Sequence, residues 1–308
     1  MGGSRTGCWM ASMVTPRARR AISIRTVDIT ESNRSARRTG AAVWSGALRH
    51  GTRHAYGIAK TMLDSTRHRR LVTTRWVASE NRWHYRWPEG RVADGGRWKD
   101  AQGWATRGTY YGMDDLLFSR YRPRAGDVVF DVGAGDGGET LYLASMVGAS
   151  GRVVSVEAAP TPFGRLHELV RRNAWPQVTP LHIALTSTPG SVTISDDPER
   201  WVAGNIFEAE GSVEVEGRTF DDVCESLGIE YVDWVKMNIE GAEKDALRGM
   251  ERMAPHIRHF TISCHDFLGT EWGRSKDEVL AWLEGHGFNA EMRGEGDFVQ
   301  QLYVYAWR

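Results

Sequence analysis

The chain has 308 residues, of which 41% are hydrophobic, and this is enough for one large domain or two modest ones with a substantial core. Its formal net charge is zero, but residues 1–75 carry 15 Lys and Arg residues against three acidic ones, whereas residues 76–308 carry 24 basic and 36 acidic residues. The acidic remainder argues against a body that binds nucleic acid, no run approaches the roughly 18 apolar residues of a membrane span, and three cysteines without metal-like spacing indicate a cytoplasmic protein without a disulfide framework.

The N-terminal part of the chain is basic and changes character near residue 41. Residues 1–40 are polar and without sustained periodicity, so we expect a disordered head there. From Val43 to Leu63, apolar residues recur at three- and four-residue spacings, which predicts helical structure. Because Arg49, Arg53 and Lys60 occupy other faces, such a helix suits peripheral contact with a membrane or a partner, or it packs on the body of the protein. We assign residues 41–115 to a helical and irregular extension.

Tryptophan is concentrated in the second half of this extension. Five of the 13 tryptophans of the chain are Trp76, Trp83, Trp87, Trp98 and Trp104. Such a density fits the lining of a sugar or lipid pocket, and it also fits a core in which the indole rings fill space and cover sheet edges. Both interpretations stay open from the sequence.

From residue 116 to residue 308, short apolar runs alternate with helical patterns, and this alternation predicts an α/β domain built on a mostly parallel sheet. The predicted strands are residues 127–132, 151–157, 178–185, 191–195, 212–216, 234–239, 259–264, 288–293 and 302–307. The predicted helices are residues 139–146, 162–173, 220–227, 243–250 and 275–285. The last two strands are close enough in sequence to pair as an antiparallel hairpin at one edge.

A glycine-rich turn follows the first strand of this domain. Gly133, Gly135 and Gly138 satisfy the pattern Gly-x-Gly-x-x-Gly, and Glu157 ends the next strand 19 residues later. Glycines let the backbone approach a ligand closely, and a carboxylate at that strand end can accept hydrogen bonds from ribose hydroxyls. Both features fit a nicotinamide dinucleotide as well as S-adenosylmethionine.

The residue at the end of the first strand favours S-adenosylmethionine. Asp131 is well placed to hold an ammonium group but poorly placed beside a pyrophosphate. An antiparallel strand pair at the C-terminus is also not needed in a dinucleotide domain. We therefore predict a cofactor site whose residues are Asp131, Gly133, Ala134, Gly135, Glu157, Ala158 and Ala184.

A second polar group interrupts an apolar strand about a hundred residues later. Lys236, Asn238 and Glu240 alternate, so they share one face of a strand and its exit, and Glu243 then opens a helix. Lys236 needs a partner because burial of an unpaired charge is costly, and Glu240 or Glu243 is the obvious candidate. These polar residues either line the site beneath a reacting centre, or they form a buried ion pair that joins the strand to the helix.

Here the sequence resembles the FkbM family of S-adenosylmethionine-dependent methyltransferases. The resemblance covers residues 127–308 and rests on Asp-Val-Gly-Ala-Gly-Asp-Gly at 131–137, Glu157, Thr-Phe-Asp-Asp at 219–222 and Lys-Met-Asn-Ile-Glu-Gly-Ala-Glu at 236–243. It implies a class I methyltransferase fold, which is Rossmann-like with an antiparallel C-terminal strand. It also implies O-methylation of a hydroxyl on a small molecule, sugar or glycolipid.

The chain departs from the family pattern at two positions. The family typically has Asp where this chain has Asn238, which cannot act as a base and is a poorer metal ligand, so we predict no metal site. The family also places a carboxylate before the histidine in the segment that here reads Ile-Ser-Cys-His-Asp at 262–266.

The catalytic candidates are His265, Glu240, Lys236 and Asn238. His265 is the first choice as base because an ordinary imidazole is largely neutral near pH 7, and Asp266 either orients it or caps a loop. Glu240 is the second choice, with Lys236 holding the acceptor oxygen. Two other functions stay open, namely a nicotinamide-dependent oxidoreductase and a non-catalytic scaffold that docks through its basic head. The sequence does not indicate the oligomeric state.

Overall fold

The computed structural model describes residues 53, 55–63, 65–66, 71–79, 82–94, 113–195, 212–269, 273–294 and 300–308. These residues belong to a compact unit that spans residues 48–308. The head predicted over residues 1–40 and two of the five clustered tryptophans, Trp98 and Trp104, lie outside the described residues. In the part of the chain that is described, no helix is long and apolar enough to cross a membrane.

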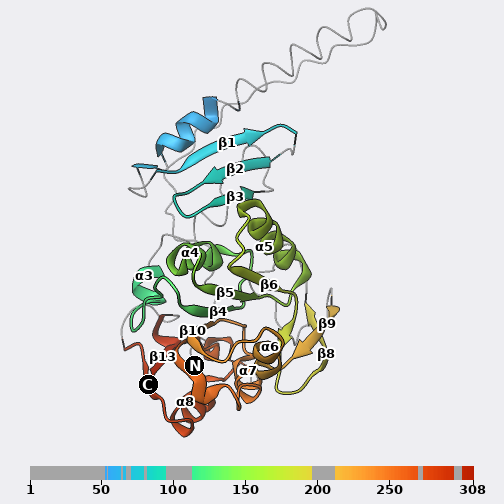
Figure 1. Cartoon of the computed structure of the whole chain (residues 1–308), viewed down its shortest axis with the longest axis vertical. Helices are drawn as coiled ribbons and strands as arrows, with labels where there is room; N and C mark the ends of the chain where they lie inside the picture. The colour runs from blue at the N-terminus through green and yellow to red at the C-terminus, as the bar shows by residue number, and fades with distance from the viewer. Residues whose placement is uncertain are drawn as a thin grey trace, which may run out of the picture. The chain divides into compact units, whose positions relative to one another are not determined.

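A seven-stranded sheet forms the centre of the domain, in the order β12-β13-β11-β10-β4-β5-β6 (Figure 1). Its strands are β4 (Val128–Val132), β5 (Arg152–Val156), β6 (Val178–Leu181), β10 (Val232–Met237), β11 (Ile257–Ser263), β12 (Asn289–Met292) and β13 (Tyr303–Trp307). Strand β13 is antiparallel to both of its neighbours, and the pairs from β6 through β5, β4 and β10 to β11 are all parallel. This confirms the expected class I methyltransferase architecture, a mostly parallel sheet with an antiparallel C-terminal strand.

Helices cover both faces of this sheet, because consecutive strand residues are apolar and point in opposite directions. Val129, Val153 and Trp234 pack with α4, whereas Phe130, Val154 and Val235 belong to a cluster that includes residues of α6, α7 and α8. The helices are α3 (Met113–Leu116), α4 (Gly138–Val147), α5 (Pro160–Asn173), α6 (Phe220–Ser226), α7 (Glu243–Arg248) and α8 (Lys276–Gly285), with 3-10 turns η2 (Ala254–His256), η3 (Asp266–Leu268) and η4 (Gln300–Leu302).

The segment predicted as one strand over residues 178–185 is divided between two sheets. Strand β6 pairs with β5 at the edge of the central sheet, where Pro180 is tolerated because an edge strand needs fewer backbone donors. After His182 the chain enters a separate three-stranded sheet in the order β7-β9-β8. Its strands are β7 (Ala184–Leu185), β8 (Gly190–Ser195) and β9 (Ser212–Arg218).

The tryptophan-rich extension contains a third sheet, which the prediction of helical and irregular structure missed. Its strands are β1 (Thr73–Val77), β2 (Arg82–Arg86) and β3 (Arg91–Asp94), all antiparallel. Trp76, Trp83 and Trp87 are buried and pack with Leu141 and Leu169 of the methyltransferase-like domain. These three tryptophans therefore fill a core, which is the second of the two interpretations left open by the sequence.

Candidate functional site

The glycine turn joins β4 to α4 at the carboxyl end of the central sheet, where ligands of open α/β sheets bind. Gly133, Gly135 and Gly137 all have positive φ angles, of 74°, 56° and 91°. The backbone N–H groups of Gly133 and Ala134 both donate to the carbonyl of Val156 at 2.9 Å. The turn is therefore tied to the end of β5.

The exits of β4 and β10 also touch at this turn. A Cβ atom at Gly133 would lie 1.9 Å from the carbonyl oxygen of Asn238, so no other residue fits at that position. The N–H of Asn238 donates to the carbonyl of Val132 at 3.0 Å. The two motifs that the sequence singled out, about a hundred residues apart, are thus in direct contact.

Glu157 lies at the end of β5 and holds the glycine turn in shape. Its Oε2 accepts from the N–H of Gly135 and its Oε1 from the N–H of Ala159, both at 2.8 Å. Burial raises the pKa of Glu157, while these two hydrogen bonds act in the opposite direction. A carboxylate offers about four acceptor positions, so two remain for the hydroxyls of a bound ribose.

Asp131 is fully buried, and the protein itself occupies both of its oxygens. Oδ1 accepts from Nζ of Lys236 at 2.9 Å and Oδ2 from Oγ1 of Thr140 at 2.7 Å. This corrects two predictions. Asp131 does not face a ligand ammonium directly, and the partner of Lys236 is Asp131 rather than Glu240 or Glu243.

Lys236 is a buried cation that contacts the glycine turn from strand β10. Its Nζ also donates to the carbonyl of Gly133 at 2.7 Å. Burial lowers the pKa of Lys236, but the charges of Asp131 and Glu139 outweigh burial and raise it. Lys236 therefore remains charged, and with a side chain only 3% exposed it cannot reach an acceptor oxygen as predicted.

Glu139 is a member of this charge cluster that the sequence analysis did not select. It lies in the first turn of α4 and is partly exposed, unlike Asp131. Burial raises its pKa, Lys236 lowers it and Asp131 raises it further. An acidic residue one position after the last glycine of the turn was the signal available in the sequence.

His265 lies just beyond the end of β11, between two carboxylates. Its Nδ1 is 2.7 Å from Oε1 of Glu243, and its Nε2 is 3.3 Å from Oε2 of Glu240. Glu243 is fully buried at the start of α7, where its Oε1 also accepts from the N–H of Gly241 at 3.1 Å. Glu240 has a φ angle of 52°, an unfavourable conformation for a residue with a Cβ atom, so the surrounding contacts fix its position.

This environment bears on the prediction that His265 is a neutral base. Burial lowers the pKa of His265, but the hydrogen bonds and charges of Glu240 and Glu243 outweigh it and raise the pKa to about 10. A ring protonated on both nitrogens has no free site to accept another proton, so this environment disfavours His265 as a neutral base. Its two contacts instead suit a residue that positions the carboxylates of Glu240 and Glu243.

Two of the four catalytic candidates are accessible. The side chain of Glu240 is 24% exposed, whereas that of His265 is 3% exposed. Asn238 is also partly exposed, at the exit of β10. Asp266 accepts from the N–H of Lys276 at 3.1 Å, and so it caps the start of α8 rather than orienting His265.

Two other predicted cofactor residues, Ala158 and Ala184, follow β5 and β6 in the chain. The carbonyl of Ala158 lies 3.0 Å from Nε2 of His182, whose ring stacks on Phe163 at 4.6 Å between centroids. Ala184 is buried in β7, two residues after His182. His182 and Phe163 are aromatic residues in this part of the chain that the sequence analysis did not select.

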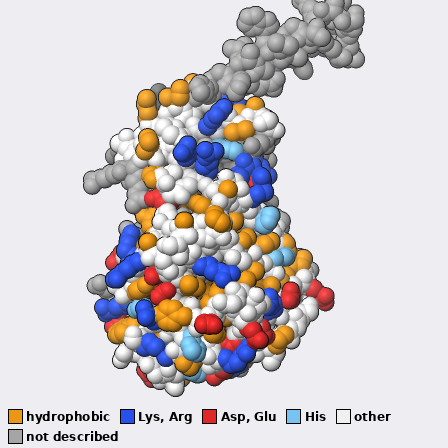
Figure 2. Space-filling model, viewed as in Figure 1, with side chains coloured by type: hydrophobic (Ala, Val, Ile, Leu, Met, Phe, Trp, Pro, Cys, Tyr) orange, Lys and Arg blue, Asp and Glu red, His pale blue; other side chains and the backbone are white. Residues whose placement is uncertain are grey.

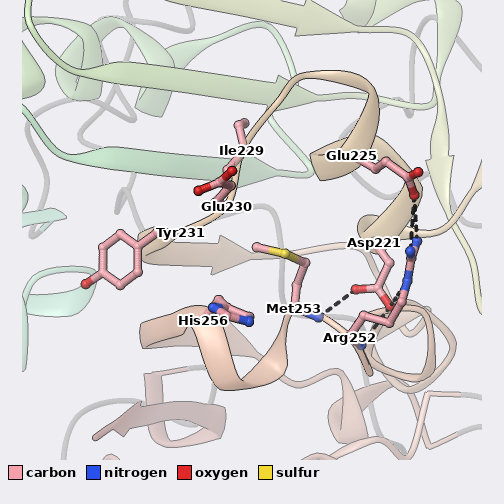
Figure 3. A pocket seen from close by; sticks show the side chains of 8 residues that line it. All are labelled: Asp221, Glu225, Ile229, Glu230, Tyr231, Arg252, Met253 and His256. Atoms are coloured by element: carbon pink, nitrogen blue, oxygen red, sulfur yellow. Dashed lines mark hydrogen bonds and ion pairs between the residues drawn. The ribbon is translucent and has the colours of Figure 1, made fainter.

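A hollow of about 500 Å³ lies elsewhere, at the amino ends of β10 and β11 (Figure 3). Asp221 at its rim accepts from the N–H groups of Arg252 and Met253 at 2.8 and 2.9 Å. Thr219 accepts from the N–H of Asp222 and caps α6. The Thr-Phe-Asp-Asp motif therefore fixes the start of α6 and the loop before β11. The hollow that it borders lies at the amino ends of the strands, whereas the glycine turn lies at their carboxyl ends.

Comparison with known proteins places this site in a family. Residues 131–290 match the model of the methyltransferase FkbM domain. The chain is 27% identical over 139 residues to the hexuronic acid methyltransferase AglP of Haloferax volcanii, an alignment that covers 45% of this chain and 56% of that protein. It is 27% identical over 197 residues to the 31-O-demethyl-FK506 methyltransferase FkbM of Streptomyces tacrolimicus, with coverage of 54% and 74%.

A solved structure gives a weaker match. The methyltransferase FkbM of Methylobacillus flagellatus shares 18% identity and a TM-score of 0.46 over 61% of this chain and 45% of that chain. The sequence match is the firmer result, because the family model spans more than half of the chain and includes both the glycine turn and the segment from Lys236 to Glu243. The chain belongs to the FkbM methyltransferase family.

Proposed function

We propose that this FkbM-family methyltransferase transfers a methyl group from S-adenosylmethionine to a hydroxyl of a small molecule, a sugar or a glycolipid. The observation that carries the proposal is the contact between the two strand exits. It brings the glycine turn next to the segment that presents Glu240, a partly exposed carboxylate. The proposed site of the methyl donor and the proposed proton acceptor thus lie together at the carboxyl ends of the strands.

The residues of the turn fit the proposed cofactor. The positive φ angles at Gly133 and Gly135 give the tight turn that follows β4, and Glu157 beside it has acceptor positions for the ribose hydroxyls. Because Asp131 is enclosed, Glu139 is the acidic side chain of the cluster that can meet the ammonium group of the cofactor. S-adenosylmethionine, when bound, supplies an electrophilic methyl group on a positively charged sulfur.

Glu240 is the residue that we assign as base. A hydroxyl is a poor nucleophile near pH 7 and must lose its proton as the new O–C bond forms. Glu240 takes this proton, while His265 holds the carboxylate in place from the side of β11. Asn238 lies two residues earlier at the same exit, where its amide can orient the acceptor through hydrogen bonds.

The acceptor class follows from the relatives by analogy. The name of one relative gives a hexuronic acid as the methyl acceptor, and the name of the other gives the 31-O position of FK506. A carbohydrate or another small molecule is the acceptor type common to both. Because the chain covers 56% of one relative and 74% of the other, we extend only this chemical class to it.

Mass spectrometry tests the proposal directly. The purified chain and cell extract are incubated with S-adenosylmethionine that carries an isotopically labelled methyl group, and labelled products are identified. We expect label on an oxygen of a carbohydrate or other small molecule. Glu240→Gln should lose at least about a hundredfold in turnover, since a general base contributes at least this much, and should still bind S-adenosylhomocysteine.

The matched control is Glu230→Gln, an equivalent change at an exposed residue beside the distant hollow. It should leave turnover unchanged. Full turnover by Glu240→Gln would remove Glu240 as the base, and label on nitrogen or on nucleic acid would contradict the acceptor class.

A further inference from the structure

The helical residues 55–63 and 65–66 pack on the β1–β3 sheet through their small and polar side chains. A Cβ atom at Gly57 would lie 2.9 Å from the carbonyl oxygen of Thr74, so the helix approaches the sheet closely there. Thr61 accepts from the N–H of Thr74 at 2.7 Å. Ser65 accepts from the N–H of Val72 at 3.0 Å and donates to its carbonyl at 3.2 Å. Gly57, Thr61 and Ser65 are four residues apart, so one helix face makes all of these contacts.

Large apolar side chains of this segment and of the chain just after it remain exposed, and of these Tyr56 also contacts the ring of Trp83 in β2. The large hydrophobic residues that are exposed in the described part of the chain all belong to this region: Tyr56 (36%), Ile58 (48%), Met62 (66%), Leu63 (62%) and Leu71 (69%). Ile58 and Met62 are one helical turn apart. An ordinary surface helix turns its apolar face inward, so this reversed arrangement marks a face that is covered by something else. We call these five residues the apolar stripe.

The surroundings of the apolar stripe are strongly positive. In the sequence, Arg67, Arg69 and Arg70 stand between Leu63 and Leu71, against one acidic residue, Asp64. The outer face of the neighbouring sheet exposes four further arginines, and Figure 2 shows Lys and Arg side chains gathered over these strands. These four are Arg75, Arg82, Arg86 and Arg91.

The arginines of the sheet face lack acidic partners among the residues that the structure describes. Arg86 and Arg91 are direct cross-strand partners, and two like charges in this relation repel each other. None of the four guanidinium groups has an ion-pair partner among the described residues. The partner of this region therefore carries negative charge.

We propose that the apolar stripe docks on the surface of a membrane that contains anionic lipids. An exposed apolar helix face combined with clustered Lys and Arg is the arrangement by which a helix lies in the headgroup region, with its apolar side chains inserted. The cations then bind the lipid phosphates. This inference is independent of the proposed acceptor, since it rests on residues outside the methyltransferase domain.

Vesicle co-sedimentation of the full chain tests this proposal. We compare vesicles of phosphatidylcholine alone with vesicles that also contain phosphatidylglycerol, at low and at high salt. The chain should bind the anionic vesicles, and high salt should weaken binding. Met62→Glu and Leu63→Glu should each lower the partition coefficient about tenfold, because each replaces an inserted apolar side chain by a charge.

Ala281→Glu is the matched control, because it adds the same charge at an exposed helical position in α8, which belongs to neither the apolar stripe nor the arginine-rich sheet face. It should reduce binding much less than the stripe variants, and all variants should retain the circular dichroism spectrum of the parent. Absence of binding to anionic vesicles would overturn the proposal. So would an equal loss in all three variants, or a dimer that Met62→Glu dissociates, which would assign the stripe to a second copy of the chain.

Discussion

At the scale of single residues, the Lys236–Asp131 pair determines whether the rim of the site is stable. The two side chains are almost completely buried and 2.9 Å apart. Lys236→Met removes the cation and leaves a buried carboxylate without its charge partner, which should destabilise the protein by about 3–5 kcal/mol. The double variant Lys236→Met/Asp131→Asn should recover much of this loss, because no unpaired charge remains. Urea unfolding measures both values, and equal stability of the two variants would contradict the pairing.

The charge of His265 makes a prediction about pH. Its pKa in the folded chain, about 10, lies above the ordinary value of 6.5. The protonated ring therefore contributes stability that is fully present below about pH 6.5 and is lost as the pH rises toward about 10. In this window the free energy of unfolding should fall by up to about 1.4 kcal/mol per pH unit from this group. A ring that NMR shows to be neutral at pH 8 would restore His265 as a candidate base.

The sequence could indicate candidate site residues better than it could indicate which side chains they contact. Gly133, Gly135 and Glu157 follow from local pattern, because glycine turns and acidic strand ends are properties of a few neighbouring residues. The partner of Lys236 could not be found in this way, since Asp131 lies 105 residues away on the adjacent strand. The pKa of His265 depends on the carboxylates of Glu240 and Glu243, which follow β10 in the chain. The ordinary pKa of histidine was therefore a poor guide to its protonation.

At the scale of elements, the glycine turn has no room for a side chain. Gly133→Ala places a Cβ atom against the carbonyl of Asn238 and at a φ angle of 74°. We expect a loss of more than about 2 kcal/mol in stability, together with weaker cofactor binding. Gly164→Ala is the control, because Gly164 lies within α5 with open space around it.

In Gly164→Ala the stability should stay equal or rise by up to about 1 kcal/mol, since alanine is the better helix former. Thermal unfolding and titration with S-adenosylhomocysteine separate the two variants. Equal stability and equal affinity of Gly133→Ala and Gly164→Ala would contradict the close contact between Gly133 and Asn238.

The elements of the methyltransferase domain were predictable because its central strands are short, continuous apolar runs that alternate with segments of helical spacing. The β1–β3 sheet was missed although Trp76, Trp83 and Tyr85 alternate with polar residues at a period of two. Its strands are only four or five residues long, and the helical spacing just before them suggested more helix. The break between β6 and β7 was also missed, because a change of sheet leaves no local signal in an apolar run.

At the scale of the whole molecule, the charges and the chemistry belong to different parts of the chain. The residues from Asp131 to His265 build the rim that we assign to methyl transfer, and the positive charge is concentrated before residue 76. The sequence composition showed this division. It could not show that the apolar side of the helix over residues 55–63 faces outward, because that depends on which face packs on the β1–β3 sheet.

Calorimetric titration of the full chain with S-adenosylhomocysteine, and separately with NADH, tests the central claim most directly. We predict binding of S-adenosylhomocysteine and no binding of NADH. Glu157→Ala should weaken the affinity at least about tenfold, because the loss of two ribose hydrogen bonds should cost more than about 1.4 kcal/mol. Binding of NADH without binding of S-adenosylhomocysteine, or an unchanged affinity in Glu157→Ala, would contradict the account.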